Sequence, residues 1–366
     1  MSVLDLARPE IRAMQPYASA RVEASGGQVM LNANESAWPP VGEEALGCNR
    51  YPDPQPAALV AALAALYGVR AGQVLVGRGS DEAIDLLVRA FCRAGQDAIL
   101  INPPTFGMYA VSARVQDAAV VEVPLDAQYR LDVDAVLAAW TPAVKLVFVC
   151  APNNPTGQGV EPAEIERLAV ALQGKAVVVV DEAYLEFAEG VPSAIGLVDR
   201  YDHVAVLRTL SKAWALAGAR VGTLIAHPEV VGLLRRIMAP YPLPLPCVRA
   251  ALEVLAPAGQ AEALAHVATV LAERTRMAAA LAKLPGVREV LPSQANFLAV
   301  RFDDPGAVYR QLLDAGIVVR DVRKYPTLGD ALRLTIGTPA ENDRVLDVLN
   351  RTAAAGQAAS SAVSGR

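Results

Sequence analysis

Lys212 is the residue whose surroundings most clearly indicate chemistry. It follows an apolar run, and Arg220 comes eight residues later. Upstream, a run of valines ends at Asp181, and Tyr184 lies three residues further on. A lysine amine can form a Schiff base with an aldehyde, a strand-end carboxylate can hold a protonated ring nitrogen, and an arginine can bind a phosphate. These are the groups that a pyridoxal phosphate enzyme requires.

Groups suited to a phosphate occur in two places. Thr209 and Ser211 are hydroxyl donors, and together with Arg220 they suit a phosphate dianion. The segment 77–82 follows a predicted strand and opens a predicted helix, where backbone N–H groups bind phosphate. Taken singly, each feature has a simpler explanation. Lys212 also fits a surface lysine, Arg220 a structural salt bridge, and the segment 77–82 an ordinary strand-to-helix turn. Their occurrence together favours a cofactor site.

Three further side chains are candidates with open alternatives. Asn154 lies in the loop 153–157 and could donate, with Tyr184, to an oxygen on the cofactor ring; alone it is typical of a turn beside proline. Phe106 could stack on the cofactor ring or be a core aromatic residue. Tyr51 lies in a proline-rich loop that turn chemistry alone explains.

The elements that must position these residues are predicted by alternating periodicities. Short apolar, β-branched runs predict buried strands at 73–76, 98–101, 120–123, 146–149, 176–180 and 204–207. Helical patterns lie between several of them, for example at 81–92 and 161–172. Fully apolar strands separated by helices predict an α/β fold with a mostly parallel central sheet covered on both faces. Ligands gather at the carboxyl ends of such strands, where Asp181 and the loop 153–157 lie.

A change of pattern near the proline-rich stretch 240–246 predicts a boundary or hinge. A long helical region follows, interrupted at 257–259, and then a shorter α+β pattern with strands around 296–302, 317–320 and 332–336. We therefore expect an N-terminal arm on the small-domain side (1–30), a large cofactor-binding domain (31–243), a small C-terminal domain (244–352) and a disordered tail (353–366).

The composition is that of a soluble, acidic, globular protein, which we expect in the cytoplasm. The chain has 366 residues, a net charge of −5 and 53% hydrophobic residues. None of its apolar stretches reaches the roughly 18–20 residues of a membrane span, and the N-terminus lacks an apolar signal-peptide core. Scattered basic residues argue against nucleic-acid binding. The four cysteines have no metal-ligand spacing, so we expect reduced thiols and no metal.

With these residues assembled, the chain resembles the fold-type I pyridoxal phosphate aminotransferases of class I/II, and among them the histidinol-phosphate aminotransferases. The resemblance covers about residues 31–337 and is highly specific, because several motifs occur in the right order. The strongest pieces are Leu31-Asn32-Ala33-Asn34-Glu35, Tyr51-Pro52-Asp53, Asn153-Asn154-Pro155-Thr156-Gly157, Asp181-Glu182-Ala183-Tyr184, Thr209-Leu210-Ser211-Lys212, Ala217-Gly218-Ala219-Arg220 and Leu332-Arg333-Leu334-Thr335-Ile336-Gly337-Thr338.

The resemblance implies a role for each matched residue. Lys212 would carry the cofactor and move the proton between Cα and the cofactor carbon. Asp181 would pair with the pyridinium, and Asn154 and Tyr184 with the ring oxygen. The cofactor phosphate would be held by Ser80 and Asp81 through their backbone, and by Thr209, Ser211 and Arg220.

The resemblance also implies a shared site and a reaction. Tyr51 would reach the cofactor phosphate of the partner subunit, so the active unit would be a homodimer. Arg333 would bind the carboxylate of glutamate or the phosphate of histidinol phosphate, with Tyr17 and Arg320 gripping the substrate phosphate. The implied reaction is a ping-pong transamination between histidinol phosphate and 2-oxoglutarate, in histidine biosynthesis. Two positions differ from the common pattern: Phe106 stands where tyrosine is also common, and Trp214 where phenylalanine is common.

The substrate stays open at this point. An aromatic amino-acid aminotransferase and a decarboxylase of threonine phosphate are alternatives, since related sequences share the same motifs. A noncatalytic regulator with an aminotransferase-like domain is a third alternative. It would need an N-terminal DNA-binding domain, for which the roughly 30 residues before Leu31 are too few. The joint presence of Lys212, Asp181 and Arg220 favours an enzyme.

Overall fold

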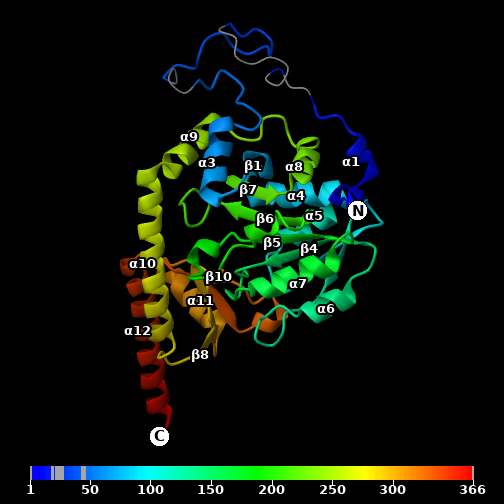
Figure 1. Ribbon diagram of the computed structural model, residues 1–366. Helices are drawn as coiled ribbons and strands as arrows, with labels where there is room; N and C mark the ends of the chain where they lie inside the picture. The colour runs from blue at the N-terminus through cyan, green and yellow to red at the C-terminus, as the bar shows by residue number, and fades with distance from the viewer. Residues whose placement is uncertain (1, 18–19, 21–28, 43–46, 365–366) are drawn as a thin grey trace.

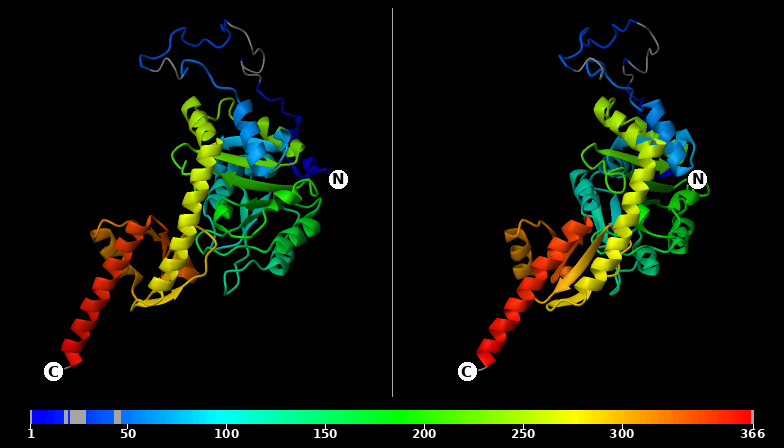
Figure 2. Two further views of the ribbon diagram at one scale, coloured as in Figure 1. Left: turned by 60° about the vertical axis from the view of Figure 1, so that its left-hand side comes forward. Right: turned by 90° about the vertical axis from the view of Figure 1, so that its left-hand side faces the viewer.

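The computed structural model describes residues 2–17, 20, 29–42 and 47–364. Two sheets organise this part of the chain, a seven-stranded one and a four-stranded one (Figure 1). The long helix α10 (Pro257–Leu281) runs from the side of the large sheet to the small one, and α12 (Pro339–Ser364) lies beside it (Figure 2). The arrangement separates a large α/β part from a smaller α+β part.

The large sheet has the strand order β1-β7-β6-β5-β4-β2-β3. All neighbouring strands are parallel except that β7 runs antiparallel to both β1 and β6. The predicted α/β fold with a mostly parallel sheet is therefore confirmed. The strands are β1 (Val74–Arg78), β2 (Ala98–Ile101), β3 (Ala119–Glu122), β4 (Val144–Cys150), β5 (Val177–Asp181), β6 (Val204–Thr209) and β7 (Val221–Ala226).

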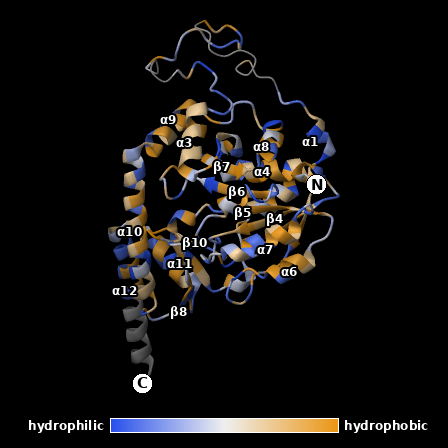
Figure 3. Cartoon of the chain, viewed as in Figure 1, coloured by the Kyte–Doolittle hydropathy of each residue, from blue (hydrophilic) through white to orange (hydrophobic). Residues whose placement is uncertain are grey.

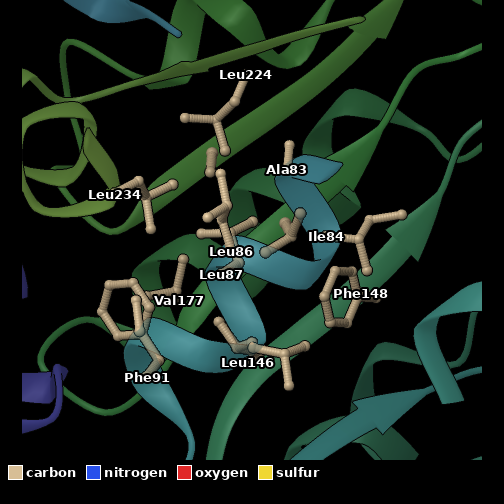
Figure 4. Close-up of a cluster of buried hydrophobic side chains, with 14 of the residues drawn as sticks. Ala83, Ile84, Leu86, Leu87, Phe91, Leu146, Phe148, Val177, Leu224 and Leu234 are labelled. Carbon is tan, nitrogen blue, oxygen red and sulfur yellow. The ribbon is translucent and has the colours of Figure 1, made fainter. Parts of the chain in front are cut away.

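Both faces of this sheet are covered, which explains why most positions of its strands are apolar. Along β4, Leu146 and Phe148 pack into one cluster with α4 (Ser80–Phe91), whereas Val147 and Val149 pack into a second cluster with α7 (Pro162–Leu172). Figure 4 shows the first cluster, in which the apolar side of α4 lies against the strands. Colouring by hydropathy shows the same concentration of apolar residues along the strands and inner helices (Figure 3).

The remaining helices follow the predicted pattern of helices between strands. The α-helices not yet given are α1 (Pro9–Ala13), α3 (Ala57–Tyr67), α5 (Met108–Val115), α6 (Val133–Ala139), α8 (Pro228–Arg235), α9 (Leu245–Leu255) and α11 (Pro305–Asp314). Short 3-10 helices are η1 (Val3–Leu6), η2 (Ala71–Gln73), η3 (Leu185–Phe187), η4 (Ala194–Leu197) and η5 (Pro326–Leu328). Among the described residues no single helix is long and apolar enough to cross a membrane; α9 and α10 meet that test only as a pair, bent by 75°.

The N-terminal helices lie on the large sheet, not on the small-domain side where we expected the arm. Val3, Ala7 and Ile11 are buried in the cluster formed by α4 and α8. They belong to η1, to the extended residue after it and to α1, and the sequence alone does not specify which domain covers them. For residues 3–11 the expected position on the small-domain side is therefore wrong, whereas the limit of the arm at residue 30 stays a prediction.

The small sheet is antiparallel, with the order β10-β11-β9-β8. Its strands are β8 (Val287–Val290), β9 (Phe297–Phe302), β10 (Arg320–Asp321) and β11 (Ala331–Thr335). Met277 and Leu281 of α10, Leu312 of α11 and Leu349 of α12 pack with β9 and β11. Helix α9, in contrast, packs on α3 through Val248 and Ala251. The exact domain limits stay a prediction.

The disorder that we expect for the tail 353–366 stays a prediction. Helix α12 continues to Ser364. This segment is rich in alanine, which has the highest helix propensity of the residues, so its composition suits a helix as well as a disordered tail.

Candidate active site

A pocket lies at the carboxyl ends of β4, β5 and β6, and its lining contains most of the predicted site residues. The structure brings ten of them together there: Ser80, Asp81, Phe106, Asn154, Asp181, Tyr184, Thr209, Ser211, Lys212 and Arg220. Cys150 and Ala183 complete the lining and were not predicted. Segments far apart in sequence meet here because parallel strands end at the same edge of the sheet.

Asp181 ends β5 as a buried carboxylate, with 3% of its surface exposed. One carboxylate oxygen accepts a hydrogen bond from the backbone N–H of Ala183, at 3.2 Å, and the other from the hydroxyl of Tyr109, at 2.7 Å. Burial raises the pKa of Asp181 to about 6. A buried carboxylate facing a pocket is stabilised by a cationic partner, and a protonated pyridine nitrogen is such a partner. The lining therefore fits this end of pyridoxal phosphate.

Lys212 lies in the connection between the antiparallel strands β6 and β7. The amide of Leu210 donates to the carbonyl of Val221 at 3.0 Å, which closes this hairpin behind the lysine. The Nζ of Lys212 lies 5.7 Å from the centre of the Tyr184 ring. Burial lowers the pKa of Lys212, and the positive charges of Arg333 and Arg220 add to this effect. A lower pKa increases the fraction of neutral amine, which is the nucleophilic form.

Donor groups converge at the other end of the pocket, where α4 begins. The Arg220 Nη1 donates to Ser211 Oγ at 3.3 Å, and Nη2 donates to Asp81 Oδ2 at 2.9 Å. Ser211 Oγ also accepts from Thr209 Oγ1 at 2.9 Å. Together with the N-terminus of α4, these groups form a cradle that suits a phosphate dianion.

Glycine is required at one position of this cradle. Gly79 precedes α4 with φ of 79°, and a Cβ there would lie 2.6 Å from Arg220 Nη2. The backbone is therefore in the left-handed region and leaves no space for a side chain beside the guanidinium. This glycine lets the start of the helix and the arginine approach each other.

The small domain contributes Arg333, which contacts Asn154 of the pocket lining. Arg333 lies on β11, and its Nη1 donates to Asn154 Oδ1. The Nδ2 of Asn154 donates to the Tyr184 hydroxyl at 3.3 Å, so that these three side chains form one chain of contacts. Burial lowers the pKa of Arg333 and raises that of Tyr184. Arg320 lies on the neighbouring strand β10, directly opposite Arg333 in the strand pairing.

Besides Arg320 and Arg333, two more predicted residues are absent from the lining of this pocket within one chain. Tyr51 is 49% exposed and stacks on Tyr241 with 4.4 Å between ring centres. Tyr17 is 71% exposed and lines a separate cavity with Arg235 and Arg236.

Sequence reasoning missed two residues that contact the predicted site. Tyr109 and Cys150 both lie beside Asp181. Helical spacing gives no signal for Tyr109, because Phe106 precedes α5 whereas Tyr109 lies in its first turn.

Comparison with known proteins identifies the family. Residues 29–349 match the model of the aminotransferase class I and II family. The chain is 57% identical over 354 residues to a histidinol-phosphate aminotransferase of Xanthomonas campestris pv. campestris, covering 96% of this chain and 98% of that protein. It is 56% identical over 357 residues to a protein of the same name from Stenotrophomonas maltophilia, with 96% and 98% covered.

A solved structure agrees with this result. The histidinol-phosphate aminotransferase from Sinorhizobium meliloti, in complex with pyridoxal-5'-phosphate, matches with a TM-score of 0.75 and 26% identity, over 88% of this chain and 90% of that chain. The fold is that of the fold-type I pyridoxal phosphate transferases, and the chain belongs to the class I and II aminotransferase family.

Proposed function

We propose that this chain is a pyridoxal phosphate-dependent transaminase that interconverts histidinol phosphate plus 2-oxoglutarate and imidazole-acetol phosphate plus glutamate, in histidine biosynthesis. The observation that carries the proposal is the meeting of Lys212, Asp181 and Arg220 in one pocket, with Arg333 bonded to Asn154 of its lining. The identity of 56–57% to proteins of that name, over nearly the whole chain, supports the choice of substrate.

Each residue of the pocket has a distinct task. When bound, pyridoxal phosphate supplies an electrophilic carbon for the substrate amine and a ring that accepts the electron pair of the Cα–H bond. Lys212 Nζ would take the proton from Cα and deliver it to the cofactor carbon, a transfer for which its lowered pKa is suited. Asp181 holds the proton on the ring nitrogen, and Tyr184 and Asn154 donate to the ring oxygen. The Arg220 cradle and the backbone N–H groups of Ser80 and Asp81 bind the cofactor phosphate.

Arg333 and Arg320 supply the positive charge for the substrate. Arg333 is partly buried and already oriented by Asn154, so a carboxylate or phosphate can replace this neutral acceptor with a charged one. Arg320 lies opposite it on the same sheet and is exposed. Two guanidinium groups on paired strands beside the pocket suit substrates with an anionic group, which both glutamate and histidinol phosphate have.

The proposed active unit is a homodimer with shared active sites, located in the cytoplasm, that binds neither nucleic acid nor membrane. Tyr51 would complete the phosphate cradle of the partner subunit. Tyr17 would contribute to the site that binds the substrate phosphate. Large apolar side chains that are exposed in the single chain support such an interface, namely Leu31 at 85% and Trp38 at 79%. Exposed apolar patches on a single chain often mark a surface that another protein covers.

The cofactor absorption spectrum tests the proposal. Purified protein with pyridoxal phosphate is mixed separately with histidinol phosphate, phenylalanine and threonine phosphate. Rapid conversion to the pyridoxamine form with histidinol phosphate alone is the expected result. A preference for phenylalanine would move the substrate to an aromatic amino acid, and release of carbon dioxide from threonine phosphate would replace transamination with decarboxylation.

A further inference from the structure

Tyr109 contacts Asp181 from behind the pocket. It lies in the first turn of α5, is completely buried, and its hydroxyl donates to Asp181 Oδ2 at 2.7 Å. The ring is held on two sides. It stacks on Phe148 with 4.7 Å between centres and 13° between planes, and it meets Phe106 edge to face at 5.5 Å. The hydroxyl position is therefore set by the packing of the core.

The hydrogen bond from Tyr109 favours the ionised form of Asp181, which its other surroundings disfavour. Burial raises the pKa of Asp181, and the negative charges of Asp81 and Glu182 raise it further, whereas the bond from Tyr109 lowers it. The titratable groups around the carboxylate come from α4, α5, β4, the end of β5 and the β6–β7 connection: Asp81, Tyr109, Cys150, Glu182, Tyr184 and Lys212. Of these groups, Lys212 alone is a cation.

We propose that Tyr109 is a positioning residue for the cofactor ring, because its hydroxyl keeps Asp181 ionised and aimed at the ring nitrogen. The inference rests on the proposed role of Asp181. One short segment then serves two contacts with the ring: Phe106 lines the pocket where the ring face would lie, and Tyr109 supports the carboxylate that meets the ring nitrogen. The Tyr109 hydroxyl acts on the cofactor ring only through Asp181. Its removal should therefore change the affinity for the cofactor, which can be measured without substrate.

The test is the affinity of the apoenzyme for pyridoxal phosphate as a function of pH, measured by fluorescence, in wild type and Tyr109→Phe. The ionised carboxylate is the form that holds the pyridinium, so affinity falls as pH drops through the pKa of Asp181. Removing a hydrogen bond to the charged form raises that pKa. We expect the midpoint of the affinity loss to move up by about one pH unit, a tenfold change in the protonation equilibrium. An unchanged midpoint would overturn the inference.

A matched control removes a similar bond elsewhere. The Tyr201 hydroxyl donates to Glu166 Oε1 at 3.1 Å, outside the pocket. Tyr201→Phe should leave the midpoint and the affinity as in wild type. A shift of equal size in this variant would show that the effect of Tyr109→Phe is a general loss of stability.

A double-mutant cycle separates this inference from the proposed function. If Tyr109 acts through Asp181, then Tyr109→Phe should change the affinity by less than twofold in an Asp181→Asn background. A full additional loss there would refute the positioning role while leaving Asp181 in place. Wild-type affinity and turnover in Asp181→Asn alone would refute the role proposed for Asp181 itself.

A second variant covers the case in which Tyr109→Phe does not fold. Incorporation of 3-fluorotyrosine at position 109 keeps the ring and the hydroxyl and makes that hydroxyl a stronger donor. The midpoint should then move to lower pH, opposite to the effect of Tyr109→Phe. A midpoint that stays in place or rises would contradict the inference.

Discussion

Replacing Arg208 with methionine should destabilise the protein strongly, because it leaves two carboxylates buried without their partner. Arg208 lies on β6 with 9% of its side chain exposed; Nη1 is 2.9 Å from Glu182 Oε2, and Nη2 is 2.7 Å from Glu186 Oε1. The side chain of Glu182 is 2% exposed. Glu186 also accepts from Trp214 Nε1 at 3.2 Å, so this cluster joins the segments that follow Asp181 and Lys212.

The size of the effect follows from burial. Breaking a buried ion pair by removing one partner costs about 3–5 kcal/mol. An unfolding entropy of about 2.1 cal/mol/K per residue gives roughly 0.8 kcal/mol/K for a chain of this length. Arg208→Met should therefore lower the thermal midpoint by about 4–7 °C, measured by calorimetry or circular dichroism at pH 8. As a control, Arg130→Met removes an exposed pair with Asp126, for which a cost below about 1 kcal/mol is expected.

The pH dependence provides a second check on the same variant. Burial already raises the pKa of Glu182, and Arg208 opposes this shift. Without Arg208 the folded-state pKa rises further above the unfolded value, so the folded protein binds more protons than the unfolded chain between those two values. Stability relative to wild type should therefore recover as pH falls from 8 toward 5. A midpoint change below about 1 °C at pH 8, or a penalty that grows on acidification, would refute the reasoning.

Three further predictions concern the pocket. Lys212→Ala should still bind pyridoxal phosphate noncovalently but not turn over, as measured by absorption spectra and by the half-reaction; a fully active variant would refute the assignment. Gly79→Ala should weaken cofactor affinity by about 5- to 150-fold, because its Cβ would lie 2.6 Å from Arg220 Nη2 in a backbone region that costs about 1–3 kcal/mol for other residues. Titration of the apoenzyme with the cofactor measures this change. Arg333→Gln should raise KM for glutamate at least tenfold, given about 1.5–3 kcal/mol for a hydrogen bond to a charged group, while cofactor affinity stays near wild type.

Strands were predictable from sequence where both faces are buried. The runs that became β1, β2, β4, β5 and β6 are apolar at nearly every position, as expected for strands covered on both sides. The run that became β3 was also predicted, although its residues are half-buried or exposed. Strand β8 was not predicted, since its residues are half-buried or exposed and its sequence Val-Arg-Glu-Val has little apolar character. Strand β7 is fully buried and was missed although it is an apolar run.

The site was predictable where chemistry limits the choice of residue, and less so where packing decides. A strand-end carboxylate, followed along the chain by a lysine and then an arginine, is enough to indicate a cofactor site from the sequence alone. Tyr109 could not be found in this way, because its contact with Asp181 joins α5 to β5 across 72 positions of sequence. The side on which the N-terminal arm lies depends on similar long-range packing, which a short apolar face does not encode.

The antiparallel strand β7 has a consequence for how this site tolerates change. Because β7 returns directly beside β6, Lys212 and Arg220 are carried by one hairpin connection between Thr209 and Val221. The number of residues in that connection therefore fixes the separation between the amine and the phosphate cradle. Substitutions within the connection alter single contacts, whereas an insertion or deletion there would move both ends of the cofactor relative to each other. We expect its length to be more restricted than its composition.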